Sequence, residues 1–378
     1  MKRRRYAVVA GGGTGGHVFA ALAVARALGE SGHEPAEIEI MGSRRGQEAA
    51  LLATSGFPLT LLPGRGIVRR FAPKDVAANV GALAASAWAT ARAAAGLGWR
   101  RPRVVVSVGG YASFPAAAAA VVWRIPLVLV NIDAVPGLVH RMLGRFAAAS
   151  AVAFPGTPLP RTVVTGTPVR AEVAAVCRSP EAAHRARTEL GLPADRTTVA
   201  VFGGSLGART LNEAAMALAR LWAARDDRTV YHVTGRRSWD PGRAGTIAQE
   251  IDAAGGLCYR AVPFEDRMDV LYEAADVVVC RAGAVTVAEL AVAGVPSVLV
   301  PLPGAPGDHQ TANARLLASK GAALLLPDGE CDGPRLSSVL EEIFGDQDHL
   351  ASMAHEARRL GHADAAARVA GVVVRHAR

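Results

Sequence analysis

The chain has 378 residues, of which 51% are hydrophobic and 20% are charged. This length predicts two or three domains, and the hydrophobic content excludes disorder as the main state of the chain. Lys and Arg total 42 against 33 for Asp and Glu, a net charge of +9, which favours an anionic partner such as nucleic acid, a membrane surface or a phosphorylated substrate.

The sequence argues against several further classes of protein. The four cysteines lie far apart, with no CxxC and no Cys/His pair at zinc-ligand spacing, so neither a disulfide framework nor a zinc site is expected. The apolar run behind the basic start Met1–Arg5 is too short for a signal peptide, which predicts a cytoplasmic protein. The uncharged stretch Val104–Trp123 is divided by Gly109-Gly110 and Pro115 into strand, turn and helix, so we expect no transmembrane segment.

Short β-branched runs alternate with alanine-rich amphipathic stretches along the whole chain, which predicts an α/β protein with parallel sheets covered by helices. In the first half, strands are expected at residues 6–10, 37–41, 59–62, 104–108, 127–130, 149–153 and 162–165. In the second half, they are expected at residues 198–202, 229–234, 256–260, 277–280, 297–300 and 322–325. The repeated alternation predicts two similar sheets.

The boundary between the two sheets is expected near residue 170, because Gly166 and Pro168 interrupt both periodicities there. We therefore predict one domain over residues 1–170 and a second over residues 171–362. A last helix, within residues 363–378, could pack on either domain, and a return to the first domain is one of the two outcomes.

Each half opens with a strand that runs into glycines and then a helix, at residues 11–17 and 203–208. Glycine lets backbone N–H groups approach a ligand, and a helix N-terminus attracts a phosphate. Ligands of open α/β sheets lie at the carboxyl ends of the strands, so two sheets facing across a cleft would bring both turns to one site. Glycines that serve only close strand–helix packing would explain one such turn better than two.

The first turn also satisfies GxGxxG through Gly11, Gly13 and Gly16. A nicotinamide enzyme expects an acidic residue at the end of the second strand, where this chain has Arg44-Arg45 instead. NAD is disfavoured, but an arginine pair suits a 2′-phosphate, so an NADP-dependent oxidoreductase is the alternative from another class. A protein that only binds its ligand is the third reading.

Two polar segments of the second half are candidates for ligand contact. Thr286 and Glu289 are spaced as a capping box at a helix start, whereas the functional alternative has Glu289 accept two hydrogen bonds from a ribose diol. Gln310 and Asn313 are three residues apart and so share one helix face, where amide side chains suit sugar hydroxyls. Solvent exposure is the plainer explanation for each amide by itself.

Taken together, these motifs resemble the MurG family, bacterial transferases that add N-acetylglucosamine to lipid-linked muramyl pentapeptide and have the GT-B fold of two Rossmann-like domains. The resemblance covers almost the whole chain. It rests on seven ordered blocks: residues 11–18, 109–111, 136–138, 166–170, 203–209, 280–289 and 308–313.

The resemblance implies a donor side in the second domain and an acceptor side in the first. On the donor side, UDP-N-acetylglucosamine would contact the following residues: Arg170, Ser205, Leu206, Gly207, Phe264, Ala284, Val285, Thr286, Glu289, Gln310 and Asn313. In this assignment Ser205 and the backbone at Leu206 hold the diphosphate, and Glu289 holds the ribose. Arg170 contacts a phosphate from the hinge between the domains, and Phe264 flanks the uracil. The acceptor, a polyprenyl-linked pyrophosphate glycolipid, would meet the first glycine turn and the segment after it: Thr14, Gly15, Gly16, His17 and Asn131.

One block departs from the family on the acceptor side. Where the family usually has His-Glu-Gln-Asn, this chain reads Val130-Asn131-Ile132-Asp133. A paralogue that glycosylates a phosphoglycolipid antibiotic precursor of the moenomycin type, with the same or another UDP-sugar, is therefore an alternative to the cell-wall enzyme.

The resemblance implies a direct displacement in which an acceptor hydroxyl attacks the anomeric carbon and UDP departs with inversion. His17 is the leading general base, because its unperturbed pKa of about 6.5 suits proton transfer near neutrality, and Asp133 is the rival. The plainer role for His17 is a hydrogen bond to the acceptor phosphate. No metal is expected, because the only DxD triplet, Asp346-Gln347-Asp348, is better explained as a helix start.

Basic and large apolar residues alternate between residues 64 and 103, which fits attachment to an anionic membrane from the cytoplasmic side. The set comprises Arg65, Arg69, Arg70, Lys74, Arg92, Arg100, Arg101 and Arg103 with Ile67, Val68, Phe71, Trp88 and Trp99. For Trp88 and Trp99, a place in the core is the competing explanation. No recognition motif supports nucleic acid as the partner.

Overall fold

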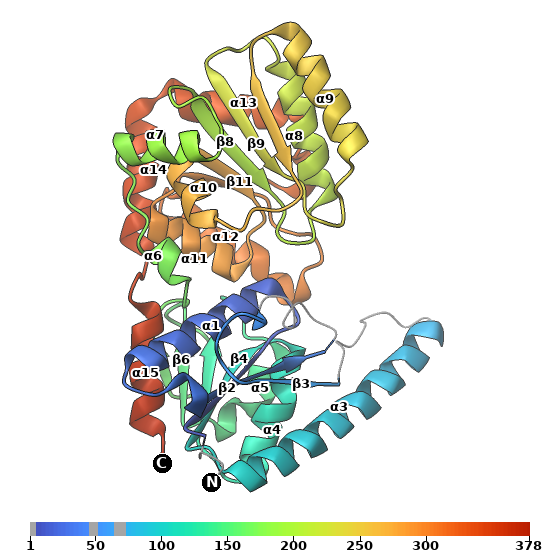
Figure 1. Cartoon of the computed structure of the whole chain (residues 1–378), viewed down its shortest axis with the longest axis vertical. Coiled ribbons are helices and arrows are strands. Elements are labelled where there is room, and N and C mark those ends of the chain that lie inside the picture. The colour runs from blue at the N-terminus through green and yellow to red at the C-terminus, as the bar shows by residue number, and fades with distance from the viewer. Residues whose placement is uncertain (1–4, 45–51, 64–72) are drawn as a thin grey trace. The chain divides into compact units, whose positions relative to one another are not determined.

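The computed structural model describes residues 5–44, 52–63 and 73–378, which form two compact units. Unit 1 contains the described residues up to Arg170 together with His362–Arg378, and unit 2 is Ala171–Gly361. Each unit consists of a parallel sheet with helices on both faces (Figure 1), so the predicted α/β class is confirmed.

The sheet of unit 1 has seven parallel strands in the order β3-β2-β1-β4-β5-β6-β7. The strands are β1 (Ala7–Gly11), β2 (Ile38–Ser43), β3 (Leu59–Leu62), β4 (Val104–Gly109), β5 (Leu127–Asn131), β6 (Ala149–Val152) and β7 (Thr162–Val164). The chain leaves β1 toward β2 on one side and later returns to β4 on the other. This reversal of strand order creates a switch point beside β1, where open α/β sheets bind ligands.

Alternate residues of these strands face different helices, as the two-residue period of a strand requires. Val8 and Ala10 pack toward α3 (Pro73–Arg100) and α4 (Phe114–Val122), whose alanines allow close approach. The other face is covered by α1 (Gly15–Glu30) and by α15 (Ala365–His376), which lies beside α1 (Figure 1). The last helix, which the sequence assigned to neither domain, thus packs on unit 1.

The sheet of unit 2 has six parallel strands in the order β10-β9-β8-β11-β12-β13. The strands are β8 (Thr197–Phe202), β9 (Arg228–Val233), β10 (Cys258–Val262), β11 (Val277–Cys280), β12 (Ser297–Leu299) and β13 (Ala323–Leu325). The order reverses beside β8 as it does beside β1, so unit 2 has a second switch point between β8 and β11.

Two hydrophobic clusters sandwich this second sheet. Ala200 and Phe202 belong to the cluster that includes α7 (Pro180–Glu189), α10 (Met268–Ala274), α11 (Ala284–Ala293) and α12 (His309–Ala318). Val199 and Val201 belong to the cluster that includes α8 (Arg209–Leu221), α9 (Pro241–Ala254) and α13 (Gly333–Gly345). The short α6 (Ala171–Ala174) opens the unit, and α14 (Gln347–Leu360) contributes to both clusters.

Helix α14 begins at the DxD triplet. The Asp346 carboxylate accepts a hydrogen bond from the His349 N–H at 2.9 Å and so caps the helix. The prediction that this triplet is a helix start is confirmed. Among the described helices, none has the length and apolar character needed to cross a bilayer.

Candidate functional site

The first glycine turn meets the turn that follows β4. Gly110 has φ +72°, and a Cβ there would overlap the carbonyl oxygen of Gly12. Gly13 has φ +92°, and its missing side chain leaves room for the Tyr111 ring, whose Cε1 would lie 2.6 Å from a Cβ. Two separate sequence blocks thus form one surface at the switch point of unit 1.

Helix α1 starts from this surface. Thr14 is its N-cap residue, but the Thr14 hydroxyl does not cap the helix; its Oγ1 lies 2.8 Å from His17 Nδ1. Gly15 and Gly16 form the first helical turn, whose N–H groups have no intrahelical acceptor. The predicted acceptor-side residues Thr14 to His17 therefore share one helix start, a place that favours an anion.

A buried histidine that the sequence analysis missed lies behind His17. His140, on α5 (Leu138–Leu143), is fully buried; its Nδ1 lies 3.1 Å from Asn131 Oδ1 and its Nε2 lies 3.3 Å from Ser107 Oγ. A Cβ at Gly109 would lie 3.3 Å from both His140 Cε1 and His17 Nε2, so the two rings pack against the same backbone. Burial and the nearby charge of His17 lower the pKa of His140 to about 4, which keeps this ring neutral at neutral pH.

The other predicted residues in unit 1 are Asn131, Asp133 and Arg170. Asn131 ends β5 and is buried; its Nδ2 donates to the Asp133 carbonyl at 2.7 Å while its Oδ1 faces His140. Both amide atoms of Asn131 thus engage protein groups, and its contact with substrate stays a prediction. Asp133 is half-buried in the loop after β5, at the same carboxyl edge as His17. Arg170 closes the unit with its guanidinium 4.8 Å from the centre of the Phe19 ring.

The second glycine turn, after β8, also touches a neighbouring turn. The Gly207 N–H donates to the Gly204 carbonyl at 2.9 Å, and both glycines have positive φ. A Cβ at Gly207 would overlap the carbonyl oxygen of Thr234, which follows β9. Ser205 and Leu206, both predicted to meet the diphosphate, lie at the middle of this turn, and Leu206 is half-exposed.

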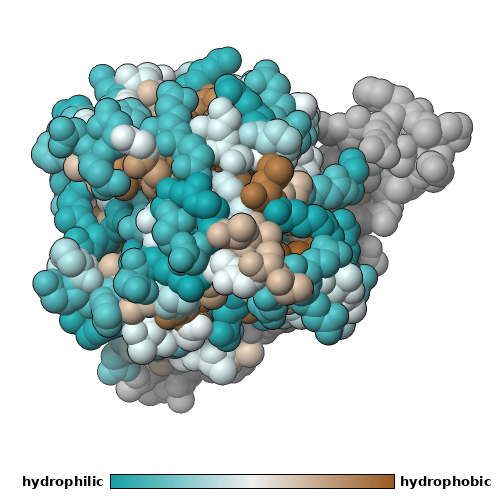
Figure 2. All heavy atoms as spheres, turned by 90° about the horizontal axis from the view of Figure 1, so that it is seen from above, coloured by the Kyte–Doolittle hydropathy of each residue, from teal (hydrophilic) through white to brown (hydrophobic). Residues whose placement is uncertain are grey.

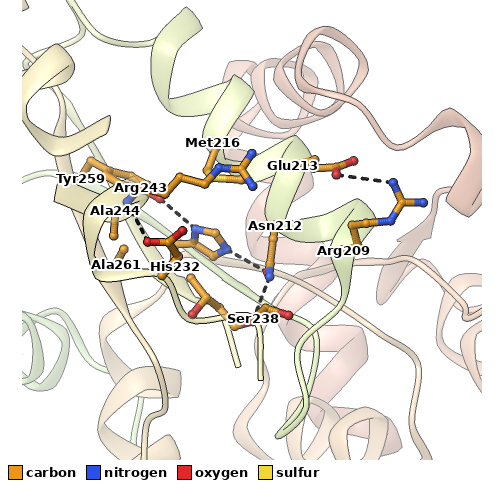
Figure 3. Close-up of a pocket in the computed structure, with 12 residues that line it drawn as sticks. Arg209, Asn212, Glu213, Met216, His232, Ser238, Arg243, Ala244, Tyr259 and Ala261 are labelled. Carbon is orange, nitrogen blue, oxygen red and sulfur yellow. Dashed lines mark hydrogen bonds and ion pairs between the residues drawn. The ribbon is translucent and has the colours of Figure 1, made fainter. Parts of the chain in front are cut away.

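A pocket of about 190 Å³ opens behind this turn, between α8 and α9 over β9 and β10 (Figure 3). Asn212 Nδ2 donates to the Thr234 carbonyl at 2.9 Å, and Asn212 Oδ1 lies 3.1 Å from His232 Nε2. His232 Nδ1 in turn lies 2.9 Å from the Tyr259 hydroxyl. These three side chains were missed as well, although a histidine inside a valine-rich strand was a usable signal, since buried polar groups need partners.

Glu289 is buried inside α11 rather than placed at its start. Helix α11 begins at Ala284 with Gly283 as N-cap and no side-chain cap, so Thr286 and Glu289 lie within the helix. The capping-box interpretation was wrong, because the turn after β11 enters the helix earlier than the spacing suggested. Glu289 Oε2 accepts a hydrogen bond from the Tyr272 hydroxyl at 2.9 Å. The Tyr272 hydroxyl thus orients the buried carboxylate, and its contact with a ribose stays a prediction.

The two amides of α12 support loops beside α11. Gln310 Oε1 accepts a hydrogen bond from the Leu302 N–H at 2.9 Å. Asn313 is fully buried and donates to the Ala282 carbonyl at 3.2 Å, within the turn that leads to Ala284, Val285 and Thr286. The structure thus links Asn313 to the start of α11, while sugar contact by either amide stays a prediction.

Phe264 follows β10, and its ring is covered on one face. The Arg236 guanidinium carbon lies 4.0 Å from the ring centre, a cation–π distance. A uracil at this position would therefore meet the other face or the edge of the ring. All of the predicted donor residues except Arg170 thus belong to unit 2, whereas Arg170 lies at the end of unit 1.

Among the described residues, no group of three or more His, Cys, Asp or Glu side chains is arranged to hold a metal ion. The chemistry that these two sites can provide is hydrogen bonding by backbone amides, proton transfer by His17 or Asp133, and carboxylate contact by Glu289.

Family models and relatives agree on what the chain resembles. The glycosyltransferase family 28 N-terminal domain matches residues 7–152, and the family 28 C-terminal domain matches residues 198–369. Two relatives, from Ralstonia nicotianae and Alkalilimnicola ehrlichii, are UDP-N-acetylglucosamine–N-acetylmuramyl-(pentapeptide) pyrophosphoryl-undecaprenol N-acetylglucosamine transferases. The first is 38% identical over 99% of this chain and 97% of its own, and the second is 39% identical over 98% and 99%.

Solved structures agree with this assignment. MurG from Acinetobacter baumannii superposes with a TM-score of 0.76 at 28% identity, over 99% of this chain and 100% of that chain. A kitacinnamycin glycotransferase, at 18% identity and a TM-score of 0.70 over the full length of both chains, shares the fold. The chain therefore belongs to glycosyltransferase family 28, as a member of its MurG type.

Proposed function

We propose that this protein transfers N-acetylglucosamine from UDP-N-acetylglucosamine to N-acetylmuramyl-(pentapeptide) pyrophosphoryl-undecaprenol. The observation that carries the proposal is the full-length similarity to transferases named for this reaction. Membership of a glycosyltransferase family disfavours the NADP-dependent oxidoreductase. The phosphoglycolipid paralogue is not favoured either, because the relatives that match along the whole chain bear the cell-wall name.

The donor would occupy the switch point of unit 2. The turn Gly204–Gly207 and the N-terminus of α8 follow β8 at this edge, where their backbone amides would hold the diphosphate. Glu289, oriented by Tyr272, would accept hydrogen bonds from the ribose. Amides fixed in place before the reaction stabilise the charge that the diphosphate gains as the bond to the sugar breaks.

The acceptor would occupy the switch point of unit 1, with its pyrophosphate at the N-terminus of α1. An acceptor hydroxyl attacks the anomeric carbon, the bond from that carbon to UDP breaks, and the hydroxyl proton passes to a base, so that the configuration inverts. His17 fits this role: in the tautomer that donates Nδ1–H to Thr14 Oγ1, Nε2 is the basic nitrogen. Transfer also requires the two sites to face each other across a cleft, which stays a prediction.

We further propose that unit 1 binds the cytoplasmic face of an anionic membrane. Of the basic and apolar set between residues 64 and 103, the members within Arg65–Phe71 lie outside the described residues. Within them, Trp88 is 61% and Trp99 is 82% exposed, so neither is a core residue and that explanation was wrong. Of the basic set, Arg100 instead donates to the buried Glu39 carboxylate at 2.7 Å.

A second exposed apolar stripe of unit 1 supports the same proposal. Leu138, Met142 and Phe146 are spaced by four residues and are 50%, 52% and 48% exposed. Arg141 and Arg145 lie exposed between them. In this arrangement the arginines would contact lipid head groups while the apolar side chains contact acyl chains. By contrast, the described residues on the face shown in Figure 2 are mostly hydrophilic, with apolar atoms in small separate patches.

The test is transfer by the purified protein. UDP-N-acetylglucosamine and a polyprenyl-pyrophosphoryl muramyl pentapeptide should yield UDP and a β-linked disaccharide, with activity unchanged in chelator. Donor binding without UDP release would identify a binding protein, and activity that needs added magnesium would contradict the metal-free mechanism. A preference for a phosphoglycolipid acceptor would revive the paralogue.

A further inference from the structure

Four hydrogen-bonding groups connect the edge strand β10 of unit 2 to the glycine turn after β8. They run from the Tyr259 hydroxyl on β10 to His232 on β9, then to Asn212 on α8, and end at the Thr234 carbonyl (Figure 3). That carbonyl is the atom a Cβ at Gly207 would overlap, so the last link lies directly behind the turn.

For a neutral His232 ring, the direction of every link follows from the last one. Because Asn212 uses its Nδ2 to donate to Thr234, its Oδ1 must accept from His232 Nε2–H. His232 Nδ1 is then the unprotonated nitrogen and accepts from the Tyr259 hydroxyl. Of the two neutral tautomers of the ring, only the one protonated at Nε2 satisfies these contacts.

The surroundings hold that state. His232 has no solvent exposure, and burial lowers its pKa to about 4. Burial likewise raises the pKa of Tyr259 to about 12, so its hydroxyl keeps the proton that it donates. All of these hydrogen bonds are therefore present at every pH near neutrality.

The glycine turn after β8 meets the turn after β9, with the Ser238 side chain beside Gly207. A Cβ at Gly235 would overlap the Gly207 backbone, so the turns after β8 and β9 touch through main-chain atoms. Such contact transmits a shift of one turn to the other, and an orphaned Thr234 carbonyl would turn toward water or toward the Gly207 backbone.

We propose that His232 and Tyr259 are positioning residues for the donor, which act through Asn212 and the Thr234 carbonyl to hold the Gly204–Gly207 turn in its diphosphate-binding geometry. This inference rests on the proposed function, since it assumes that the diphosphate binds at that turn. Neither residue touches the donor in this account. These two residues affect donor binding only through the position of the Gly204–Gly207 turn.

The experiment compares His232→Leu with His232→Gln in the full chain. Leucine removes both links, whereas glutamine can donate to Asn212 and accept from Tyr259. We expect His232→Leu to raise the KM for UDP-N-acetylglucosamine and the Kd for UDP about tenfold, the loss expected for a buried hydrogen bond, with the acceptor KM unchanged. His232→Gln should restore both constants to within about threefold of wild type.

The readouts separate positioning from mere stability. A variant that only folds poorly has fewer active molecules, so its apparent kcat falls while both KM values and the Kd for UDP stay unchanged. That pattern, or unchanged donor constants in His232→Leu, would overturn the inference. His184→Leu, on the exposed surface of α7, is the matched control and should behave as wild type.

A second variant and a wild-type control complete the experiment. If His232→Leu does not fold, Tyr259→Phe removes one hydroxyl and should raise the Kd for UDP about threefold; no change would overturn the inference. Failure of the wild-type protein to bind UDP would instead count against the proposed function. In that case no UDP-sugar binds at the turn that these hydrogen bonds hold.

Discussion

The carboxyl edges of the two sheets are built from similar elements, but they differ in the residues beside the buried histidine. Each has a glycine turn in backbone contact with a neighbouring turn, and each has a buried neutral histidine oriented by an asparagine, His140 with Asn131 and His232 with Asn212. In unit 1 the buried ring packs beside a second histidine, His17, which is only partly buried. In both units the asparagine donates to a main-chain carbonyl, that of Asp133 in unit 1 and that of Thr234 in unit 2, so the second histidine is what distinguishes unit 1.

This difference indicates a division of labour. A histidine beside a helix N-terminus can both face an anion and take a proton, whereas a hydrogen-bonded backbone turn can only hold charge in place. The edge of unit 1 is thus suited to the chemical step and the edge of unit 2 to donor binding. Four predictions test whether the two edges separate in this way.

The largest effect is expected at the base. His17→Ala should lower kcat by about 1,000-fold at saturating donor, because a positioned general base contributes on that order, and should leave the Kd for UDP unchanged. Asp133→Asn serves as the comparison and should lose far less. If His17→Ala stays active and Asp133→Asn loses most of its activity, Asp133 is the general base instead of His17.

The next effect is expected at the turns. Gly207→Ala should weaken UDP binding by about 100-fold, because a Cβ would strain a positive-φ residue and displace the turn. Gly110→Ala should cost a similar factor in acceptor kcat/KM while UDP binding, measured by calorimetry, stays normal. Gly245→Ala on α9, where a Cβ meets nothing within 4 Å, is the control. Loss of UDP binding in Gly110→Ala would show that donor binding also depends on the carboxyl edge of unit 1.

Acid should destabilise both units through their buried histidines. Each has a pKa of about 4 in the folded protein against 6.5 when unfolded, so the unfolded state binds more protons and stability falls as the pH drops through this window. From pH 7 to pH 5 each should cost about 2 kcal/mol of unfolding free energy. Urea unfolding at both pH values should show a smaller acid loss in His140→Gln and in His232→Gln; an unchanged loss contradicts the assignment.

The smallest effect is expected at the membrane. Arg141→Ala with Arg145→Ala should lower the partition coefficient for anionic vesicles at low salt, measured by sedimentation, about thirtyfold, since each basic residue near such a surface contributes about 1 kcal/mol. Arg315→Ala with Arg335→Ala removes the same charge from exposed positions of unit 2 and should leave binding intact. Equal losses in both pairs would mean that net charge, and not this stripe of unit 1, attracts the membrane.

Much of the fold was predictable because its signals are local. The β-branched runs located the strands of both sheets to within about two residues, and the glycines after β1 and β8 marked the turns at the switch points. The start of α11 was not predictable from spacing, because Thr286 and Glu289 fit a cap as well as a helix interior. His140 and His232 were missed for a related reason: a single polar residue in an apolar run does not reveal its partners.

The sequence by itself determined that the chain alternates strands and helices, where its two glycine turns lie and which family it resembles, since each depends on the order of neighbouring residues. Only the tertiary structure decided that α15 packs on unit 1, that Glu289 meets Tyr272, and that Asn212 and Asn131 orient buried histidines. These contacts join residues far apart in the chain, and their energy depends on burial and geometry that exist only after the sheets have formed.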